Sequence, residues 1–235
     1  IGNPGTNLEV SDRVRVYRGR SRVAGYRGIS VGFPEGIHYA FNAETGALSA
    51  LWKGEFVSVG WGGQGAGNFN PRSRSVQLPQ DLAFQPVSQR GKPWPILPKM
   101  TKENPVNPDP LYPKNLGYKF RGYSLDDQGV PTFSYEFGKL AVEDCSRAQP
   151  LAEVHLLRRT LRITSPDRDS VLFRALVGKI EKEKEGVFAT PELRLKMLDG
   201  QPRLKEGSDG NHELIVELSL NKGESQFVFD YEALR

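Results

Sequence analysis

Cysteine is almost absent from this chain: Cys145 is the only one among 235 residues. A single cysteine can form neither an intrachain disulfide nor a cysteine-based metal cluster, so we interpret it as a small buried apolar residue. Histidine is rare too, and His38, His155 and His212 do not stand in a spacing such as His-x-His. Because a metal site needs several converging ligands, the sequence predicts neither a metal site nor a bound cofactor.

Long hydrophobic runs are also missing. No apolar segment approaches the roughly 20 residues that span a bilayer, so we expect no membrane insertion. Hydrophobic residues make up 37% of the chain and charged residues 26%, as in a soluble globular protein. Nothing in the middle resembles a flexible linker, so residues 1–235 are predicted to form a single domain.

The net charge is +4 with a pI near 9.1, which raises the question of a nucleic-acid partner. Basic residues alternate with acidic ones in segments such as Lys179–Glu185. On this interpretation no basic stripe is present, and we predict no nucleic-acid partner.

Helical periodicity is scarce, whereas short segments of period-two alternation recur every 8 to 12 residues, as in stacked antiparallel sheets. Only residues 180–185 fit a helix, and they fit a solvated edge or loop equally well. About fourteen strands are predicted, at residues 8–18 (with Arg13-Val14-Arg15-Val16-Tyr17), 28–33, 37–41, 47–52, 55–59, 118–125, 132–137, 140–144, 153–164, 171–177, 187–189, 193–198, 212–220 and 226–231.

Two of these segments carry a more detailed prediction. Alternation fails at Leu156-Leu157-Arg158-Arg159, which indicates a bulge that reverses the inward face. The segments 218–223 and 226–229 are expected to form a β-hairpin. The predicted fold is an all-β, antiparallel, multi-stranded sandwich, preferred over a β-propeller because internal repeats are missing. In strand number alone it resembles the supersandwich of galactose-mutarotase-like domains, a fold analogy that carries no activity.

The tract from Gly54 to Pro113 stands apart because it is rich in glycine, proline, asparagine and aromatic residues. We expect a long loop system that crosses one end or face of the sandwich. Its glycine-rich run, residues 62–67, lacks the Lys-Ser/Thr of a phosphate-binding loop, which argues against nucleotide binding.

Candidate binding residues come mainly from this tract, because aromatic rings stack on sugar faces while amides, carboxylates and guanidinium groups bind hydroxyls. Trp61, set among glycines, is predicted to bind, and Trp94, between two prolines, to plug the loop onto the sheet. The alternative is that Trp52 packs in the core and the remaining aromatic residues are all plugs. The candidate binding residues are His38, Trp61, Asn68, Asn70, Arg72, Asp109 and Tyr112, with Asp81 as a further polar candidate.

Residues 13–17, 28–46 and 51–57, followed by 118–125 and 129–135, resemble a poorly characterised all-β domain that accompanies c-type cytochrome modules in large secreted bacterial proteins. The phrases that carry the resemblance are Gly-Phe-Pro-Glu-Gly-Ile-His-Tyr-Ala-Phe-Asn-Ala at 32–43 and Tyr-Lys-Phe-Arg-Gly-Tyr-Ser-Leu at 118–125. The resemblance covers roughly residues 10–165. It implies a periplasmic or extracellular location and partners such as a c-type cytochrome or dehydrogenase module.

This chain lacks the Cys-x-x-Cys-His motif, so any haem must belong to another module. The function implied is that of a non-catalytic accessory domain, which binds a glycan or a sister module through its aromatic loops. The alternative is a carbohydrate-active hydrolase, lyase or epimerase with a histidine and paired carboxylates from Glu44, Glu55, Asp81 and Asp109. A purely structural spacer is a third interpretation. We assign no catalytic residue.

Overall fold

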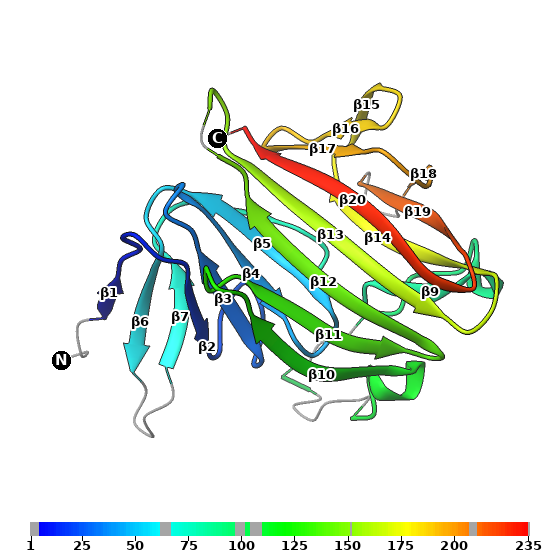
Figure 1. The fold of residues 1–235 in the computed structure, drawn as a ribbon, viewed down its shortest axis with the longest axis horizontal. Helices are drawn as coiled ribbons and strands as arrows, with labels where there is room; N and C mark the ends of the chain where they lie inside the picture. Colours follow the sequence, from blue (N-terminus) through cyan, green and yellow to red (C-terminus); the bar gives the residue numbers. More distant parts are fainter. Residues whose placement is uncertain are drawn as a thin grey trace.

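The computed structural model describes residues 5–61, 67–96, 102–103, 110–150, 152–206 and 211–234. These residues form twenty β-strands and two short 3-10 helices, η1 (Val87–Gln89) and η2 (Lys114–Leu116), with every strand pair antiparallel inside four sheets (Figure 1). The predicted all-β class is therefore confirmed. None of the described helices is long and apolar enough to span a bilayer.

The largest sheet has eight strands in the order β10-β11-β12-β13-β20-β17-β16-β15. Their bounds are β10 Tyr118–Leu125, β11 Pro131–Phe137, β12 Leu140–Ala148, β13 Leu156–Ser165, β20 Gly223–Ala233, β17 Leu193–Met197, β16 Val187–Ala189 and β15 Glu181–Lys184. Residues 180–185, where the sequence left helix, edge and loop open, thus include the edge strand of this sheet.

Three smaller sheets complete the fold. The five-stranded sheet has the order β2-β3-β4-β5-β8, with β2 Arg15–Arg18, β3 Gly28–Gly32, β4 Ile37–Asn42, β5 Ala47–Lys53 and β8 Ser75–Gln77. The four-stranded sheet is β18-β19-β14-β9, with β18 Gln201–Glu206, β19 His212–Leu220, β14 Asp169–Gly178 and β9 Phe84–Pro86. The three-stranded sheet is β1-β6-β7, with β1 Thr6–Leu8, β6 Val57–Trp61 and β7 Gly67–Pro71.

One face of the eight-stranded sheet packs against both the five-stranded and the four-stranded sheets, which makes the body a sandwich (Figure 1). Phe41 of β4 stacks on Phe133 of β11, with ring centroids 4.1 Å apart. Phe173 of β14 meets Phe229 of β20 at 5.1 Å. A single hydrophobic core therefore joins these sheets.

The strands β3, β4 and β5 of the five-stranded sheet are buried on both faces, because the three-stranded sheet covers its far side. β3 and β4 are buried along their whole length. A second apolar cluster fills this interface and includes Trp52, Phe56 and Phe69. Gly32 allows the close approach, since an added Cβ would lie 2.9 Å from the Phe56 ring. Period-two alternation, predicted at residues 28–33 and 37–41, is typical of strands with one solvent-facing side. That expectation is corrected here, because small residues on the second face admit another layer.

The predicted hairpin at residues 218–229 is wrong. β19 pairs with β14 and β18, whereas β20 pairs with β13 and β17 in the opposite layer. The chain also passes from the eight-stranded to the four-stranded sheet between β13 and β14. The β13–β14 and β19–β20 connections therefore both cross between the two layers. Turn residues and spacing are alike for a hairpin and for such an arch, and the pairing partner alone separates them.

The predicted bulge in β13 is also wrong, because β13 keeps an unbroken register with β12 and β20. Its alternation includes Arg159 as an inward-pointing member. The guanidinium donates from Nε to Asp144 Oδ1 at 2.9 Å and from Nη2 to Oδ2 at 2.6 Å, and Tyr135 donates to the same carboxylate at 2.9 Å. Both charged side chains are at most 3% exposed, so this buried ion pair replaces an apolar residue in the pattern.

The Gly54–Pro113 tract contains more regular structure than predicted. It includes β6, β7, β8 and β9 as well as η1. The strands are three to five residues long, so their glycines, prolines and asparagines can lie at strand ends or on the outward face of a sheet edge.

Candidate functional site

The structure separates the predicted binding residues of β6 and β7 onto two faces of the three-stranded sheet. Val57 and Val59 point inward, and Trp61, next on that side, lies at the end of β6 and is 52% exposed. Asn68 and Asn70 flank the inward-pointing Phe69 and therefore face outward. Trp61 and the two asparagines thus belong to neighbouring but different surfaces.

Arg72 and Tyr112 have structural contacts. Arg72 forms ion pairs with Glu9 and Glu55, the latter at 2.8 Å. The Tyr112 hydroxyl accepts a hydrogen bond from the Leu82 N–H at 2.9 Å, and its half-buried ring packs on the main core. Burial raises the Tyr112 pKa, so its hydroxyl stays protonated. Asp109 lies outside the described residues.

His38 is buried in β4, with both ring nitrogens bonded to the main chain. Nδ1 accepts from the Phe33 N–H at 3.1 Å, which leaves the proton on Nε2, 2.8 Å from the Gly54 carbonyl oxygen. Burial lowers the pKa of His38 below its ordinary value of 6.5, so the neutral ring is favoured. The ring thereby joins the turn after β3 to the segment after β5 in the five-stranded sheet.

Two of the three tryptophans are internal. Trp52 is 1% exposed and its indole N–H donates to the carbonyl oxygens of Glu55 and Phe56, as the core interpretation predicts. Trp94 is 7% exposed, donates to the Leu82 carbonyl oxygen at 2.6 Å and lies 6.0 Å from the Arg174 guanidinium. Trp94 therefore plugs its loop onto the sheet, and Trp61 is left as the exposed tryptophan.

The described carboxylates of the enzymatic alternative lie in separate surroundings. Glu55 pairs with Arg72, whereas Asp81 lies 3.9 Å from Arg174 and 3.5 Å from the Tyr112 hydroxyl. Glu44 is in the turn between β4 and β5. Over the described ranges, no cluster of three or more His, Cys, Asp or Glu side chains could hold a metal ion.

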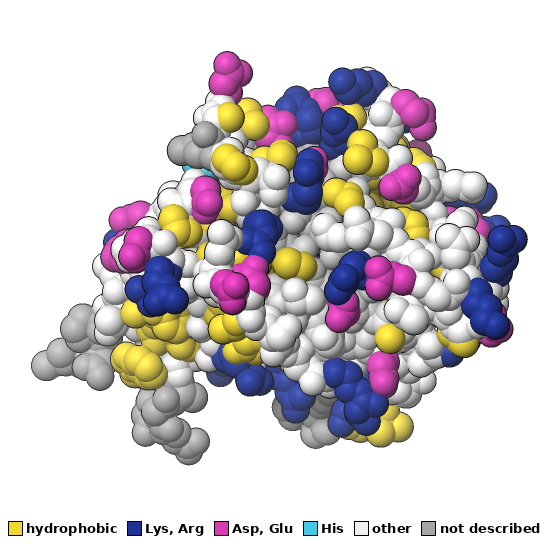
Figure 2. Space-filling model, in the orientation of Figure 1, with side chains coloured by type: hydrophobic (Ala, Val, Ile, Leu, Met, Phe, Trp, Pro, Cys, Tyr) yellow, Lys and Arg dark blue, Asp and Glu magenta, His cyan; other side chains and the backbone are white. Residues whose placement is uncertain are grey.

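A group of arginines that the sequence interpretation passed over forms the most conspicuous charged feature. Six arginines and no acidic residue occur between residues 13 and 27, and all six are exposed. We call this group the arginine edge: it comprises Arg13, Arg15, Arg18, Arg20, Arg22 and Arg27. Its residues lie on and around β2, an edge strand of the five-stranded sheet, and on the segment between β2 and β3. Lys and Arg side chains gather along the lower margin of the molecule, below β2, β3 and β10 (Figure 2).

The arginine edge forms no ion pair with a carboxylate among the described residues. Ten of the twelve described arginines after residue 27 form ion pairs, and none of the six edge arginines does. The register explains this contrast, because Arg15 lies opposite Gly32 and Arg18 opposite Ile29. The neighbouring strand offers no acidic residue. The contacts that remain are weak: after the Ser11 hydroxyl, Arg15 and Arg13 help to lower the pKa of the exposed Asp12, and the Arg22 guanidinium donates to the Pro71 carbonyl oxygen at 3.4 Å.

Two of the edge arginines, Arg20 and Arg22, lie directly beside the outward asparagines of β7. Arg20 forms a parallel bridge with Asn68, which places both side chains on the same side of the sheet. The Arg22 N–H donates to Asn70 Oδ1 at 2.9 Å. The Arg20 guanidinium lies 4.7 Å from the ring centre of Tyr26, which is 63% exposed. Guanidinium, amide and aromatic groups therefore share one open surface.

A signal for this surface was present in the sequence. A count of charge in windows of about 15 residues identifies the segment at once. The net charge of the chain, +4, is smaller than the charge of these six residues alone, so the remainder is slightly acidic. The alternating segment at 179–185 is not representative of the whole chain.

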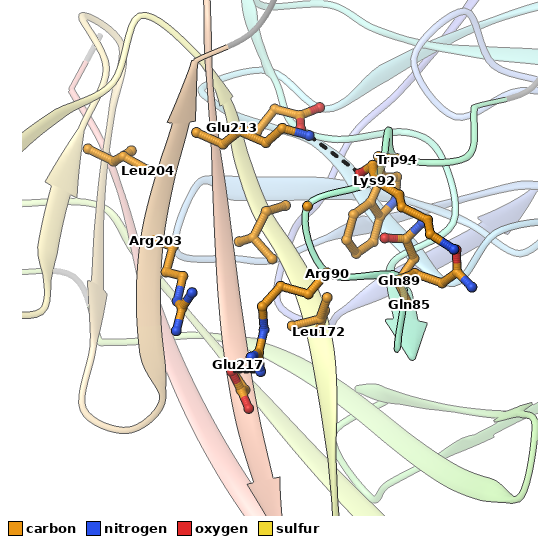
Figure 3. Close-up of a pocket in the computed structure, with 13 residues that line it drawn as sticks. Gln85, Gln89, Arg90, Lys92, Trp94, Leu172, Arg203, Leu204, Glu213 and Glu217 are labelled. Atoms are coloured by element: carbon orange, nitrogen blue, oxygen red, sulfur yellow. Dashed lines mark hydrogen bonds and ion pairs between the residues drawn. The ribbon is translucent and has the colours of Figure 1, made fainter. Parts of the chain in front are cut away.

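A hollow lies at the opposite end of the molecule from the arginine edge, between the loop after β9 and the four-stranded sheet (Figure 3). Its volume is about 280 Å3, and Trp94, Leu172 and Ile215 contribute apolar walls. Arg90 and Glu217 form an ion pair of 2.5 Å on one side of it. The predicted site residues do not line this hollow, except that Trp94, predicted as a plug, forms one wall.

No family model matches the chain, and no curated protein matches it. The functional argument therefore depends on the geometry of the chain itself.

Proposed function

We propose that this chain is a non-catalytic binding domain that holds an anionic glycan on the arginine edge. One observation carries the proposal: the six edge arginines form no ion pair with a described carboxylate, although most arginines elsewhere in the described chain do. Clustered like charges repel one another and destabilise a fold slightly. An external polyanion would relieve that repulsion, because guanidinium groups bind carboxylates and sulfates in a two-pronged geometry.

The neighbouring groups favour a glycan over a nucleic acid. Asn68 and Asn70 offer amide groups beside Arg20 and Arg22, and amides both donate and accept hydrogen bonds. Sugar hydroxyls can use both roles, whereas phosphate oxygens only accept. The exposed ring of Tyr26 adds an aromatic face for stacking.

The likeness to domains that accompany c-type cytochrome modules supports the setting that we propose. On this view the domain belongs to an exported protein, periplasmic or extracellular, and works beside a cytochrome or dehydrogenase module that it helps to bring to a polysaccharide. Binding to such a sister module through the same surface is the alternative form of this proposal.

The test is affinity for a polyuronate, a neutral dextran and a DNA duplex of similar length, each titrated with the purified domain at low and high salt. We expect the polyuronate to bind most tightly and its affinity to fall as salt rises. The triple variant Arg15→Gln, Arg18→Gln, Arg20→Gln should weaken polyuronate binding on the order of tenfold or more.

A matched control removes the same amount of positive charge elsewhere. Arg121, Arg147 and Arg162 are partly exposed, and each pairs with a carboxylate. Changing these three to glutamine should leave polyuronate affinity within about threefold of the parent, because the lost charges were already compensated. Equal losses in both triple variants would mean that only net charge matters. Tighter DNA binding would replace the glycan with a nucleic acid.

A further inference from the structure

The hollow at the four-stranded sheet is a small cavity with apolar walls. Its floor is the outward face of β14 and β19, where Leu172 and Ile215 lie among charged neighbours. Its far wall is the loop that carries Lys92 and Trp94, as Figure 3 shows. Leu204 of β18 lies beside the cavity but pairs with the core residue Leu214, so its side chain points to the other face of the sheet (Figure 3). A volume of about 280 Å3 lies near the lower limit for sites that hold small organic molecules.

The acidic side chains of this cavity are already neutralised. Glu217 pairs with Arg90 and Glu213 with Arg174, both at 2.5 Å. Both carboxylates are less than a fifth exposed, so a cationic ligand would have to displace an existing partner.

The remaining cations at the cavity have no carboxylate partner among the described residues. Arg203 of β18 projects from the strand opposite Ile215, as Figure 3 shows. Lys205 reaches across the mouth, and its Nζ donates to the Lys92 carbonyl oxygen at 3.4 Å. An apolar interior with uncompensated positive charge at its entrance suits a molecule with an apolar body and one anionic group.

We propose that this cavity binds a small carboxylate with an aromatic or branched apolar body. The body would contact Leu172, Ile215 and the wall formed by Trp94, and the carboxylate would meet Arg203 at the mouth. The site is independent of the arginine edge, because β9, β18 and β19 lie at the opposite end of the long axis from β2, β6 and β7 (Figure 1).

The experiment uses three probes of equal length: 4-phenylbutyrate, 4-phenylbutanol and 4-phenylbutylamine. Each is titrated into the isotope-labelled domain, and the indole N–H signal of Trp94, assigned through Trp94→Phe, reports occupancy of the cavity. We expect the carboxylate to shift this signal saturably, the alcohol to bind about tenfold more weakly, and the amine more weakly still.

Exposed variants test the mouth without endangering the fold. Arg203→Gln should weaken the carboxylate about three- to tenfold and leave the alcohol unchanged. The control Leu204→Ser changes the next residue of β18, whose side chain points to the other face of the sheet, and should change neither affinity. The control Arg168→Gln changes an exposed arginine outside the cavity and should also change neither.

Several outcomes would overturn the proposal. No saturable shift of the Trp94 signal at millimolar probe would mean that the cavity takes no such ligand. Equal affinity of alcohol and carboxylate, or a preference for the amine, would refute the anionic class. Unchanged carboxylate affinity in Arg203→Gln would remove the assigned contact.

Discussion

Arginine side chains form ion pairs in one region of this molecule and lack them in another. In the eight-stranded sheet Arg158 lies directly opposite Asp230, and Arg162 opposite Glu143, and each pair forms a salt bridge. Along β2 the same residue type faces glycine and isoleucine on the neighbouring strand. An arginine that pairs across the sheet has its charge neutralised by a carboxylate of the same chain. An arginine without an ion pair keeps a positive charge that an external anion could neutralise. The contrast separates arginines with an ion pair inside the fold from those that we propose to bind an external anion.

The largest expected effect lies at the most deeply buried arginine. Replacement of Arg159 by methionine leaves Asp144 buried without its partner and should cost about 3 to 5 kcal/mol of unfolding free energy in urea denaturation. The double variant with Asp144→Leu should recover part of this loss. A cost of about 1 kcal/mol or less, the amount expected for the exposed Arg162→Gln, would contradict our description of the buried pair.

A similar contrast between interior and surface should hold for tryptophan. Trp94→Ala removes a buried ring and its hydrogen bond to Leu82, and should cost about 3 to 5 kcal/mol by the same measurement. Trp61→Ala, at a half-exposed strand end, should cost less than about 1 kcal/mol. A stability loss in Trp61→Ala as large as that in Trp94→Ala would mean that Trp61 is a plug as well.

The buried His38 should make stability depend on pH. Its pKa is lowered in the folded state by burial, so at pH values below 6.5 the unfolded chain takes up a proton that the folded chain does not. Stability should therefore fall as pH drops from 7 towards 5, and His38→Gln should flatten this slope. An unchanged slope in His38→Gln would contradict this assignment.

The smallest effect is expected at the arginine edge. Arg15→Gln, Arg18→Gln and Arg20→Gln together should leave stability unchanged or raise it by up to about 0.5 kcal/mol at low salt, because they relieve repulsion and break no ion pair. The gain should disappear in 1 M salt. A clear loss of stability would show that these residues have structural partners, and the comparison that opens this Discussion would fail.

Local patterns predicted single strands well but not their partners. Residues 118–125 and 187–189 match β10 and β16 residue for residue, because their alternation is set by which face is buried. The segments around residue 220 were paired with each other, although they belong to different layers. Arg159 was interpreted as a break in the pattern because its acidic partner, Asp144, is distant in the sequence and its position depends on strand register.

The candidate site was only partly predictable for the same reason. Glycines around Trp61 indicated a binding residue, which stays a prediction, and prolines around Trp94 indicated a plug, which the burial of that ring confirms. That Asn68 would lie beside Arg20 depends on a bridge between segments almost fifty residues apart. The charge of residues 13–27 was visible, but its lack of partners could be learned only from the register of β2 and β3.

The β13–β14 and β19–β20 connections, which cross between the two layers, affect how the eight-stranded sheet assembles during synthesis. β20 lies between β13 and β17, so the eight-stranded sheet is two separate pieces until residues 223–233 are in place. During synthesis, β10 to β13 emerge before β20, so one side of β13 stays unpaired until β20 has been made. An unpaired strand edge attracts other chains. Translation speed or a chaperone acting over residues 156–233 should therefore influence the yield of folded protein more strongly than events near the N-terminus.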